Sequence, residues 1–299
     1  MDSPDIRKVI RRSLTLVFLV SLIVGSGGFY LMLRDQTLKN AASQARLLLA
    51  SAMGVRDYTN DRIAPLAGQL PPGVFHEETV PFFAAQSVFA RVSAGEHAFT
   101  YREAALNPTA PADRASDFEV GLIQRFRADP GLTEISGSRD VGADRVFFLA
   151  RRIRITDAQC LTCHDTPARA PPAMVAKYGP ANGFGWKLGE TVGAQMIGLP
   201  VTDQFRATLY LATVVAVGLI VIFVMAYLAL STALEVLVAA PLGQLASAAD
   251  EASRTASAAT PLPAGGVGEI RRLAAAIERL RISLAKALAE LSAGRPPAP

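Results

Sequence analysis

The chain has 299 residues, of which 51% are hydrophobic and 19% are charged, and its mean hydropathy is +0.28. A soluble domain carries about 25% charged residues, so this composition argues against a purely soluble protein and excludes an intrinsically disordered one. With two cysteines, the chain cannot be a secreted scaffold built on several disulfides. Half of the net charge of +4 comes from the residues before the first apolar stretch and the rest is spread along the chain, so we expect no nucleic-acid partner.

Two uncharged stretches carry the excess hydrophobicity. Residues 13–33 and 207–234 both exceed the roughly 20 apolar residues that a membrane span needs. We therefore predict transmembrane helices at 13–33 and 207–232, with the rest of the second stretch continuing as a helical stalk. The first stretch could instead be a cleaved signal peptide, although it is long for one and no Ala-x-Ala cleavage site follows it.

The basic residues before the first span predict the topology. Lys and Arg are retained on the cytoplasmic side of a membrane, and four of them lie within residues 1–12, namely Arg7, Lys8, Arg11 and Arg12. Residues 1–12 and the C-terminus are therefore expected in the cytoplasm, and residues 34–206 outside it. The pattern indicates a bacterial inner-membrane protein with a periplasmic domain.

Residues 36–60 predict a helix that continues out of the first span. Its apolar positions recur at three-to-four spacing; they are Leu38, Ala41, Ala42, Ala45, Leu48, Leu49, Ala52 and Met53. This alanine-rich stripe would either pair with the same helix of a second subunit or pack on its own domain.

The external domain reads as α+β. Short apolar runs at 146–150 and 195–199 predict strands. Residues 117–128 predict an amphipathic helix with its apolar face inward, formed by Phe118, Leu122, Ile123 and Phe126. A domain of this length is large enough to form its own core.

Residues 233–291 predict two helices joined by a connector. The first begins at Pro241-Leu242 and presents one face with Leu242, Leu245, Ala249 and Ala252. The second follows Gly268-Glu269 with a nearly heptad repeat of Ile270, Leu273, Ile277, Leu280, Leu284, Leu288 and Leu291. Residues 292–299 form a flexible tail. The arrangement resembles a HAMP linker, which implies a cytoplasmic parallel four-helix bundle in a homodimer; the alternative is an ordinary dimerising coiled coil.

The sequence Cys160-Leu161-Thr162-Cys163-His164 carries the strongest chemical signal. C-x-x-C-H is typical of covalent c-type haem attachment, because two thiols three residues apart can each add to one vinyl group on the same porphyrin edge. His164 then lies under the iron as the proximal ligand. A thioredoxin-like redox pair, a disulfide or a zinc site are the alternatives, but a zinc site needs four ligands and the chain has only two further histidines, His76 and His97.

Several further strings resemble the periplasmic c-type haem sensor domain of PAS-like fold that was formerly catalogued as a domain of unknown function. They are residues 56–59, 99–109, 114–119, 160–164, 170–171, 178–179, 182–186 and 193–195. Thr109 stands where this family usually has an arginine. The resemblance implies one covalent haem c, a domain between two transmembrane helices and a HAMP linker after the second.

The distal iron ligand is not fixed by spacing. The resemblance places the first external helix beside the haem, so Met53 is the first candidate and His97 the second; His76, Met174, Met196 and an open position remain. Met/His ligation would raise the reduction potential. Arg151, Arg152, Arg154 and Lys187 are candidates for contacts with the haem propionates, and Trp186 and Phe184 for walls of the haem site.

These observations lead to one main hypothesis and one alternative. The main hypothesis is a homodimeric, membrane-anchored haem-c redox or gas sensor that signals through HAMP to a separate cytoplasmic protein, with dimer contacts in HAMP and the first external helix. The alternative is a membrane-anchored c-type cytochrome that passes electrons to a periplasmic redox partner. We expect no enzyme, because no acid–base or nucleophile constellation is found in the sequence.

Overall fold

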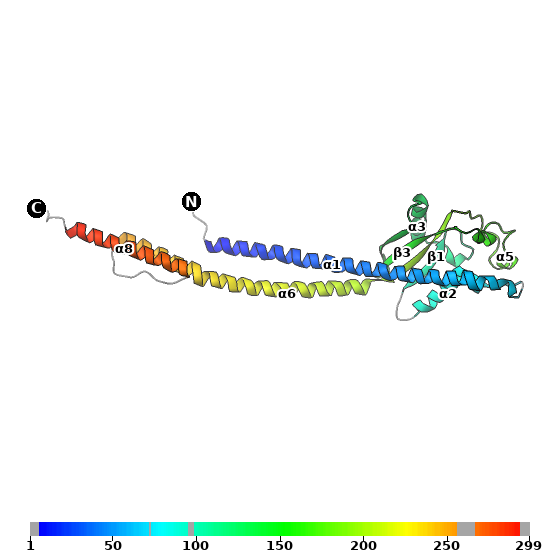
Figure 1. The fold of residues 1–299 in the computed structure, drawn as a ribbon, viewed down its shortest axis with the longest axis horizontal. Coiled ribbons are helices and arrows are strands. Elements are labelled where there is room, and N and C mark those ends of the chain that lie inside the picture. The colour runs from blue at the N-terminus through cyan, green and yellow to red at the C-terminus, as the bar shows by residue number, and fades with distance from the viewer. Residues whose placement is uncertain (1–5, 72, 95–98, 256–266, 294–299) are drawn as a thin grey trace. The chain divides into compact units, whose positions relative to one another are not determined.

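The computed structural model describes residues 6–71, 73–94, 99–255 and 267–293. Its contacts divide the chain into two compact units (Figure 1). Residues 30–210 form the first unit, and the residues up to 29 together with those from 211 onward form the second.

The first unit is built on a four-stranded antiparallel sheet with the order β1-β4-β3-β2 (Figure 1). Its strands are β1 (Thr100–Ala105), β2 (Glu134–Val141), β3 (Asp144–Arg154) and β4 (Thr191–Pro200). The strands predicted at 146–150 and 195–199 are therefore confirmed, and each extends beyond its predicted ends. β2 and β3 form a hairpin across Gly142, whose φ of 62° suits glycine.

One face of the sheet is covered by α3 (Asp117–Ala128). A capping box between Ser116 and Glu119 starts this helix, which has the predicted bounds. Its predicted inward side chains pack on Phe148, Ala150, Ala194 and Met196. The sequence pattern therefore identified both the helix and its buried face.

The opposite face is covered by α1 (Ile6–Tyr58) and α2 (Pro81–Ser93). Ala41, Ala45, Leu49 and Ala52 of α1 are buried against this face of the sheet. The alanine-rich stripe thus packs on its own domain, one of the two arrangements expected from the sequence. Small alanine side chains let the α1 backbone approach the sheet closely.

Shorter helical segments complete the first unit. They are η1 (Thr59–Ile63), η2 (Ala64–Gln69), η3 (Glu77–Thr79), η4 (Pro111–Asp113), η5 (Ala158–Cys160), α4 (Leu161–His164) and α5 (Pro172–Tyr178). Together with the sheet and the three longer helices they give an α+β domain, as predicted.

Two helical stretches in the described residues are long and apolar enough to cross a membrane, judged by length and composition. One is Lys8–Gln69, which includes most of α1, and the other is Thr202–Glu251, which begins with α6 (Thr202–Leu234). Within the second unit, the rings of Phe18 and Phe223 stack with centroids 5.2 Å apart. α6 begins at Thr202, five residues before the predicted start of the second span at 207.

The chain stays helical after α6 through η6 (Glu235–Ala239), a single π-turn, into α7 (Ala240–Thr255). Proline has no backbone N–H and disturbs the preceding helical turn, which explains why the π-turn comes just before Pro241. α8 (Gly268–Ala293) follows. Leu245 of α7 is buried with Ile270 and Ala274 of α8, so the two predicted helices pack on each other.

Candidate functional site

The C-x-x-C-H sequence folds into a single tight helical turn. Cys160 ends η5, and Cys163 and His164 belong to α4. Asp157 starts the turn by accepting a hydrogen bond from the Gln159 N–H at 2.8 Å. Both thiols are unbridged; Cys160 is exposed and Cys163 is half-buried. The turn therefore presents two free sulfurs beside the imidazole.

His164 is held in one orientation by two contacts. Its Nδ1 donates to the backbone carbonyl of Gly183 at 2.7 Å. Its imidazole also stacks on the indole of Trp186, with ring centroids 3.9 Å apart and planes 14° apart. Because Nδ1 is engaged by a carbonyl, the lone pair of a neutral ring lies on Nε2. This nitrogen is the one that His164 offers to a metal ion.

The pKa shifts of His164 and Cys163 both result mainly from burial. Burial lowers the pKa of the His164 imidazole, an effect that the hydrogen bond to Gly183 partly offsets. The ring is therefore neutral at pH 7, as metal ligation requires. Burial, followed by the nearby Cys160, raises the pKa of the Cys163 thiol.

The carbonyl of Gly183 is fixed by the loop that contains it. Gly183 has a φ of 84°, and a Cβ placed on it would lie 2.1 Å from Thr109 Oγ1 and 2.8 Å from Thr109 Cα. Gly185 N–H donates to the Asp165 carbonyl at 2.8 Å, and Trp186 N–H donates to the His164 carbonyl at 3.2 Å. The loop after Gly183 is thus bound to the turn that carries His164.

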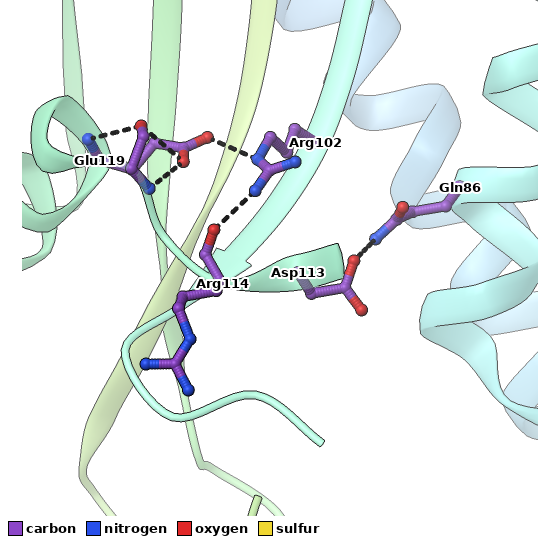
Figure 2. A network of polar contacts seen from close by, with 6 residues as sticks. Gln86, Arg102, Asp113, Arg114 and Glu119 are labelled. Carbon is purple, nitrogen blue, oxygen red and sulfur yellow. Dashed lines mark hydrogen bonds and ion pairs between the residues drawn. The ribbon is translucent and has the colours of Figure 1, made fainter. Parts of the chain in front are cut away.

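The segment that follows Thr109 is bound to α2 and to β1. Figure 2 shows Gln86 of α2 bonded to Asp113, and Arg102 of β1 bonded both to the Arg114 carbonyl and to Glu119. The Asp113 contact is 3.0 Å and the Arg102–Glu119 ion pair is 2.9 Å. Among the described residues, the buried Thr109 Oγ1 has no hydrogen-bond partner. Thr109 thus makes a packing contact against Gly183.

Met53, the first candidate for a distal ligand, lies near the end of α1 and is half-buried. Its sulfur accepts a hydrogen bond from Gln195 Nε2 of β4 at 3.2 Å. Two residues before Gln195, Gly193 of β4 pairs with Ala105 of β1, so both strands carry small residues at that position.

Arg56 lies one turn further along α1 and binds the sheet as well. Its guanidinium donates to the carboxylate of Glu103, whose side chain is 0% exposed, and the Tyr101 hydroxyl donates to the same carboxylate. Burial of Arg56 disfavours its charged form, but the nearby Glu103 carboxylate outweighs this effect, so the pKa of Arg56 is raised. Tyr101 and Cys160 raise this pKa further. Glu103 faces Gln195 across the β1–β4 pair. Met53 and Arg56 therefore dock the end of α1 onto adjacent strands.

The candidate propionate contacts bind groups of the chain itself. Arg151 pairs with Glu134 at 3.4 Å, Arg152 donates to the Pro130 carbonyl at 2.5 Å, and Arg154 donates to the Gly189 carbonyl at 2.8 Å. Lys187 is exposed beside Trp186. Phe184 is half-buried in the same loop.

The structure also places the remaining candidates for the distal ligand. Met196 is buried on the sheet face that packs against α3, opposite the α1 face, and Met174 is buried in α5. His76 lies before η3, with Nδ1 4.0 Å from Glu78. His97 lies outside the described residues.

The donor set fits a covalently attached haem. Such a group needs two unbridged thiols and one neutral imidazole nitrogen in a short segment, and residues 160–164 supply all three. Within the described ranges, no cluster of three or more His, Cys, Asp or Glu side chains is arranged to hold a metal ion.

Comparison with known proteins places this domain in a family. A sequence profile described as Tll0287-like matches residues 34–200, more than half of the chain. The chain belongs to the Tll0287-like family. The match begins four residues into the first unit and ends with β4.

The crystal structure of the cyanobacterial heme-protein Tll0287 matches 51% of this chain and 94% of its own, with 21% sequence identity and a TM-score of 0.37. No curated protein sequence matches.

Four residues of the site had no role in the sequence analysis: Gly183, Gln195, Glu103 and Arg56. All four lie in strings that resemble the haem sensor domain, and that was their only sequence signal. A buried carboxylate that meets a cation on a distant helix is a tertiary relationship, and neither spacing nor periodicity reports it.

Proposed function

We propose that the chain is a membrane-anchored haem-c sensor of redox state or of a diatomic gas. Cys160 and Cys163 hold one haem by thioether bonds, and His164 Nε2 is the proximal ligand. The domain is PAS-like and periplasmic, and its output passes through a HAMP-like linker to a separate cytoplasmic protein. When bound, the haem supplies a one-electron redox centre and, with an open position, a site for a diatomic gas.

One observation carries this proposal. Two unbridged thiols lie in one helical turn with an imidazole whose Nδ1 is engaged by the Gly183 carbonyl. A metal-ligating histidine characteristically donates its other ring N–H to a carbonyl or carboxylate, which fixes its tautomer and orientation. The Trp186 ring adds a second restraint on His164. The site is therefore organised for ligation by Nε2.

On the distal side, Met53 favours a redox signal over a gas signal. Its sulfur is held by Gln195 of the sheet, and Met/His ligation raises the reduction potential and leaves no vacant position. Family membership supports the haem assignment, because the solved relative Tll0287 is described as a heme-protein.

The connection from the site to the two apolar helices supports signalling. Met53 belongs to the same continuous helix, α1, whose N-terminal part contains the first candidate span. β4, which carries Gln195, is followed within two residues by α6, the second candidate span. A change at Met53 or Gln195 would therefore act on elements that continue along the chain into both helices.

The helices after α6 would supply the bistable element that a relay needs. α7 and α8 bury Leu245, Ile270 and Ala274 together, whereas the heptad residue Leu280 is 72% exposed. In a HAMP-like homodimer a second copy would cover Leu280. Along α1 the alanine-rich stripe is already covered by the sheet, so any dimer contact there uses other side chains of the helix.

Cross-linking in membranes tests the relay. Leu280→Cys is treated with a bismaleimide in the dithionite-reduced and ferricyanide-oxidised states, with Ile282→Cys as the control; Ile282 is also exposed, at 54%, but lies off the heptad repeat. A sensor predicts dimer formation through position 280 at a rate that differs between the two states. Equal rates would contradict signalling and favour an electron carrier.

Spectra of the same protein with CO and with NO identify the signal. Binding of either gas to the reduced protein would indicate a gas sensor. A spectrum unchanged by both gases would indicate redox sensing with Met53 in place.

A further inference from the structure

The ion pair between Arg56 and Glu103 has a role beyond holding α1 to the sheet. The carboxylate of Glu103 in β1 is fully buried, and the Arg56 guanidinium is the cation paired with it. A buried ion pair is seldom a net gain in stability, because the desolvation of both ions offsets their attraction. Its presence beside a candidate redox site therefore calls for another explanation.

The pair lies at the end of α1 that also carries Met53. Arg56 lies one helical turn after Met53, and its guanidinium is within electrostatic reach of Cys160. Glu103 lies on the sheet side of Arg56, where it also accepts a hydrogen bond from Tyr101. The pair therefore lies one helical turn from the candidate distal ligand Met53.

Partial burial strengthens the electrostatic effect of this cation. Water screens it poorly, since the Arg56 side chain is only 24% exposed and Glu103 is not exposed at all. A fixed positive charge disfavours the addition of a further positive charge nearby. Oxidation of the site removes one electron and adds one positive charge. The Arg56 cation therefore makes oxidation less favourable, and the negative charge of Glu103 weakens that effect.

We propose that the Arg56–Glu103 pair sets the midpoint potential of the site and couples its redox state to the end of α1. This inference rests on the proposed haem function. The coupling is reciprocal: if the Arg56 cation makes oxidation harder, then oxidation makes it easier for Arg56 and the α1 turn that carries it to leave the sheet. Arg56 and Glu103 are positioning residues that act through their charge.

Redox titration of the full-length, haem-containing protein with ferricyanide and dithionite tests the inference. Arg56→Gln removes the cation and is expected to shift the midpoint potential downward. Glu103→Gln leaves the cation without its counter-charge and is expected to shift it upward. Arg56→Lys retains the charge, and Tyr101→Phe removes only a hydroxyl donor, so both controls should remain near the unaltered value.

Opposite shifts cannot come from a merely structural ion pair, because both single substitutions would then lower stability in the same direction. Shifts of equal sign, or no shift in either variant, would overturn the inference. If Glu103→Gln does not fold, the midpoint potentials of Arg56→Gln and Arg56→Lys still distinguish the loss of charge from the loss of packing, because only the first variant removes the cation.

Hydrogen exchange gives a second readout. In the unaltered protein we expect faster amide exchange over residues 50–58 in the oxidised state than in the reduced state, and we expect Arg56→Gln to abolish that difference. Equal exchange in both states of the unaltered protein would overturn the coupling. A pyridine haemochrome assay precedes both measurements: absence of covalent haem would overturn the proposed function and this inference with it, whereas haem with unshifted potentials would overturn the inference alone.

Discussion

The indole of Trp186 lies parallel to the imidazole of His164, with ring centroids 3.9 Å apart. Trp186 is the only tryptophan in the chain. All tryptophan fluorescence of this protein therefore originates next to the residue that we assign as the proximal ligand.

That relationship gives a direct optical prediction. A haem attached at residues 160–164 would accept excitation energy from Trp186, so we expect the folded haem-containing protein to fluoresce far more weakly than the Cys160→Ser/Cys163→Ser double variant. Steady-state emission excited at the indole band measures this. Equal emission from the two proteins would be incompatible with a haem at this turn.

Gly183→Ala is expected to disrupt the support of His164. A side chain at a φ of 84° costs about 1 kcal/mol of backbone strain, and here its Cβ would also overlap Thr109. Overpacking of this kind adds roughly 1–3 kcal/mol. We therefore expect a large loss of stability in urea denaturation, with a perturbed haem absorption spectrum.

Gly185→Ala is the matched control for this substitution. Gly185 has a φ of 79°, but a Cβ placed there would meet no atom within 4 Å. It should lose only about 1 kcal/mol, for backbone strain, and should keep its spectrum. Similar losses in both variants would show that contact with Thr109 does not constrain Gly183.

Met53→Leu tests the distal ligand. Leucine replaces methionine in a protein interior at a cost usually below about 1.5 kcal/mol, so the fold should persist while the sulfur is removed. We expect the reduced spectrum to change and the midpoint potential to fall, because the thioether stabilises ferrous iron. Met174→Leu, at a buried methionine of α5, should leave both unchanged; an unaltered spectrum in Met53→Leu would eliminate Met53 as a ligand.

Glu77 gives a prediction of pH dependence. It lies in η3 and binds α5, accepting from Lys177 at 2.6 Å and from the Tyr178 hydroxyl. The hydrogen bonds from Lys177 and then Tyr178 lower the pKa of Glu77, while burial and then the Glu77 contact raise the pKa of Tyr178 to about 12. Tyr178 therefore keeps its hydroxyl proton at neutral pH and donates it in the hydrogen bond to Glu77.

Because the pKa of Glu77 is lower in the folded chain than in the unfolded one, its stabilisation is present above the unfolded pKa of about 4.3. It is lost as the pH falls through the folded pKa. Urea denaturation should show the unaltered protein more stable than Glu77→Gln at pH 7, with the gap closing below about pH 4. Glu78→Gln, beside it in η3, should show a smaller gap; a Glu77 gap that persists in acid would refute the assignment.

Local patterns predicted the elements of this fold well. The period of 3.6 gave α3 its bounds and its buried face, and short apolar runs located β3 and β4. The turn to which we assign the haem was also evident from adjacent residues, because Cys160, Cys163 and His164 lie within five positions. The residues that hold this turn and the neighbouring helix in place could not be predicted from adjacent positions. Gly183 and Trp186 lie about 20 residues after His164, and Arg56 and Glu103 are 47 positions apart.

The alanine-rich stripe of α1 also shows where prediction from the sequence pattern ends. Its period predicted a helix with one buried face, but it could not say whether a second subunit or the chain's own sheet covers that face. In the structure the chain's own sheet, whose strands come from residues 100–200, covers that face.

Covalent attachment of one haem through Cys160 and Cys163 is tested most directly by intact mass spectrometry of the full-length chain, produced in cells that attach haem c and then denatured in acid. We predict that the mass of the polypeptide increases by that of one haem, and that the Cys160→Ser/Cys163→Ser double variant loses this increase. A polypeptide that keeps its unmodified mass under these conditions would contradict the assignment of a c-type haem.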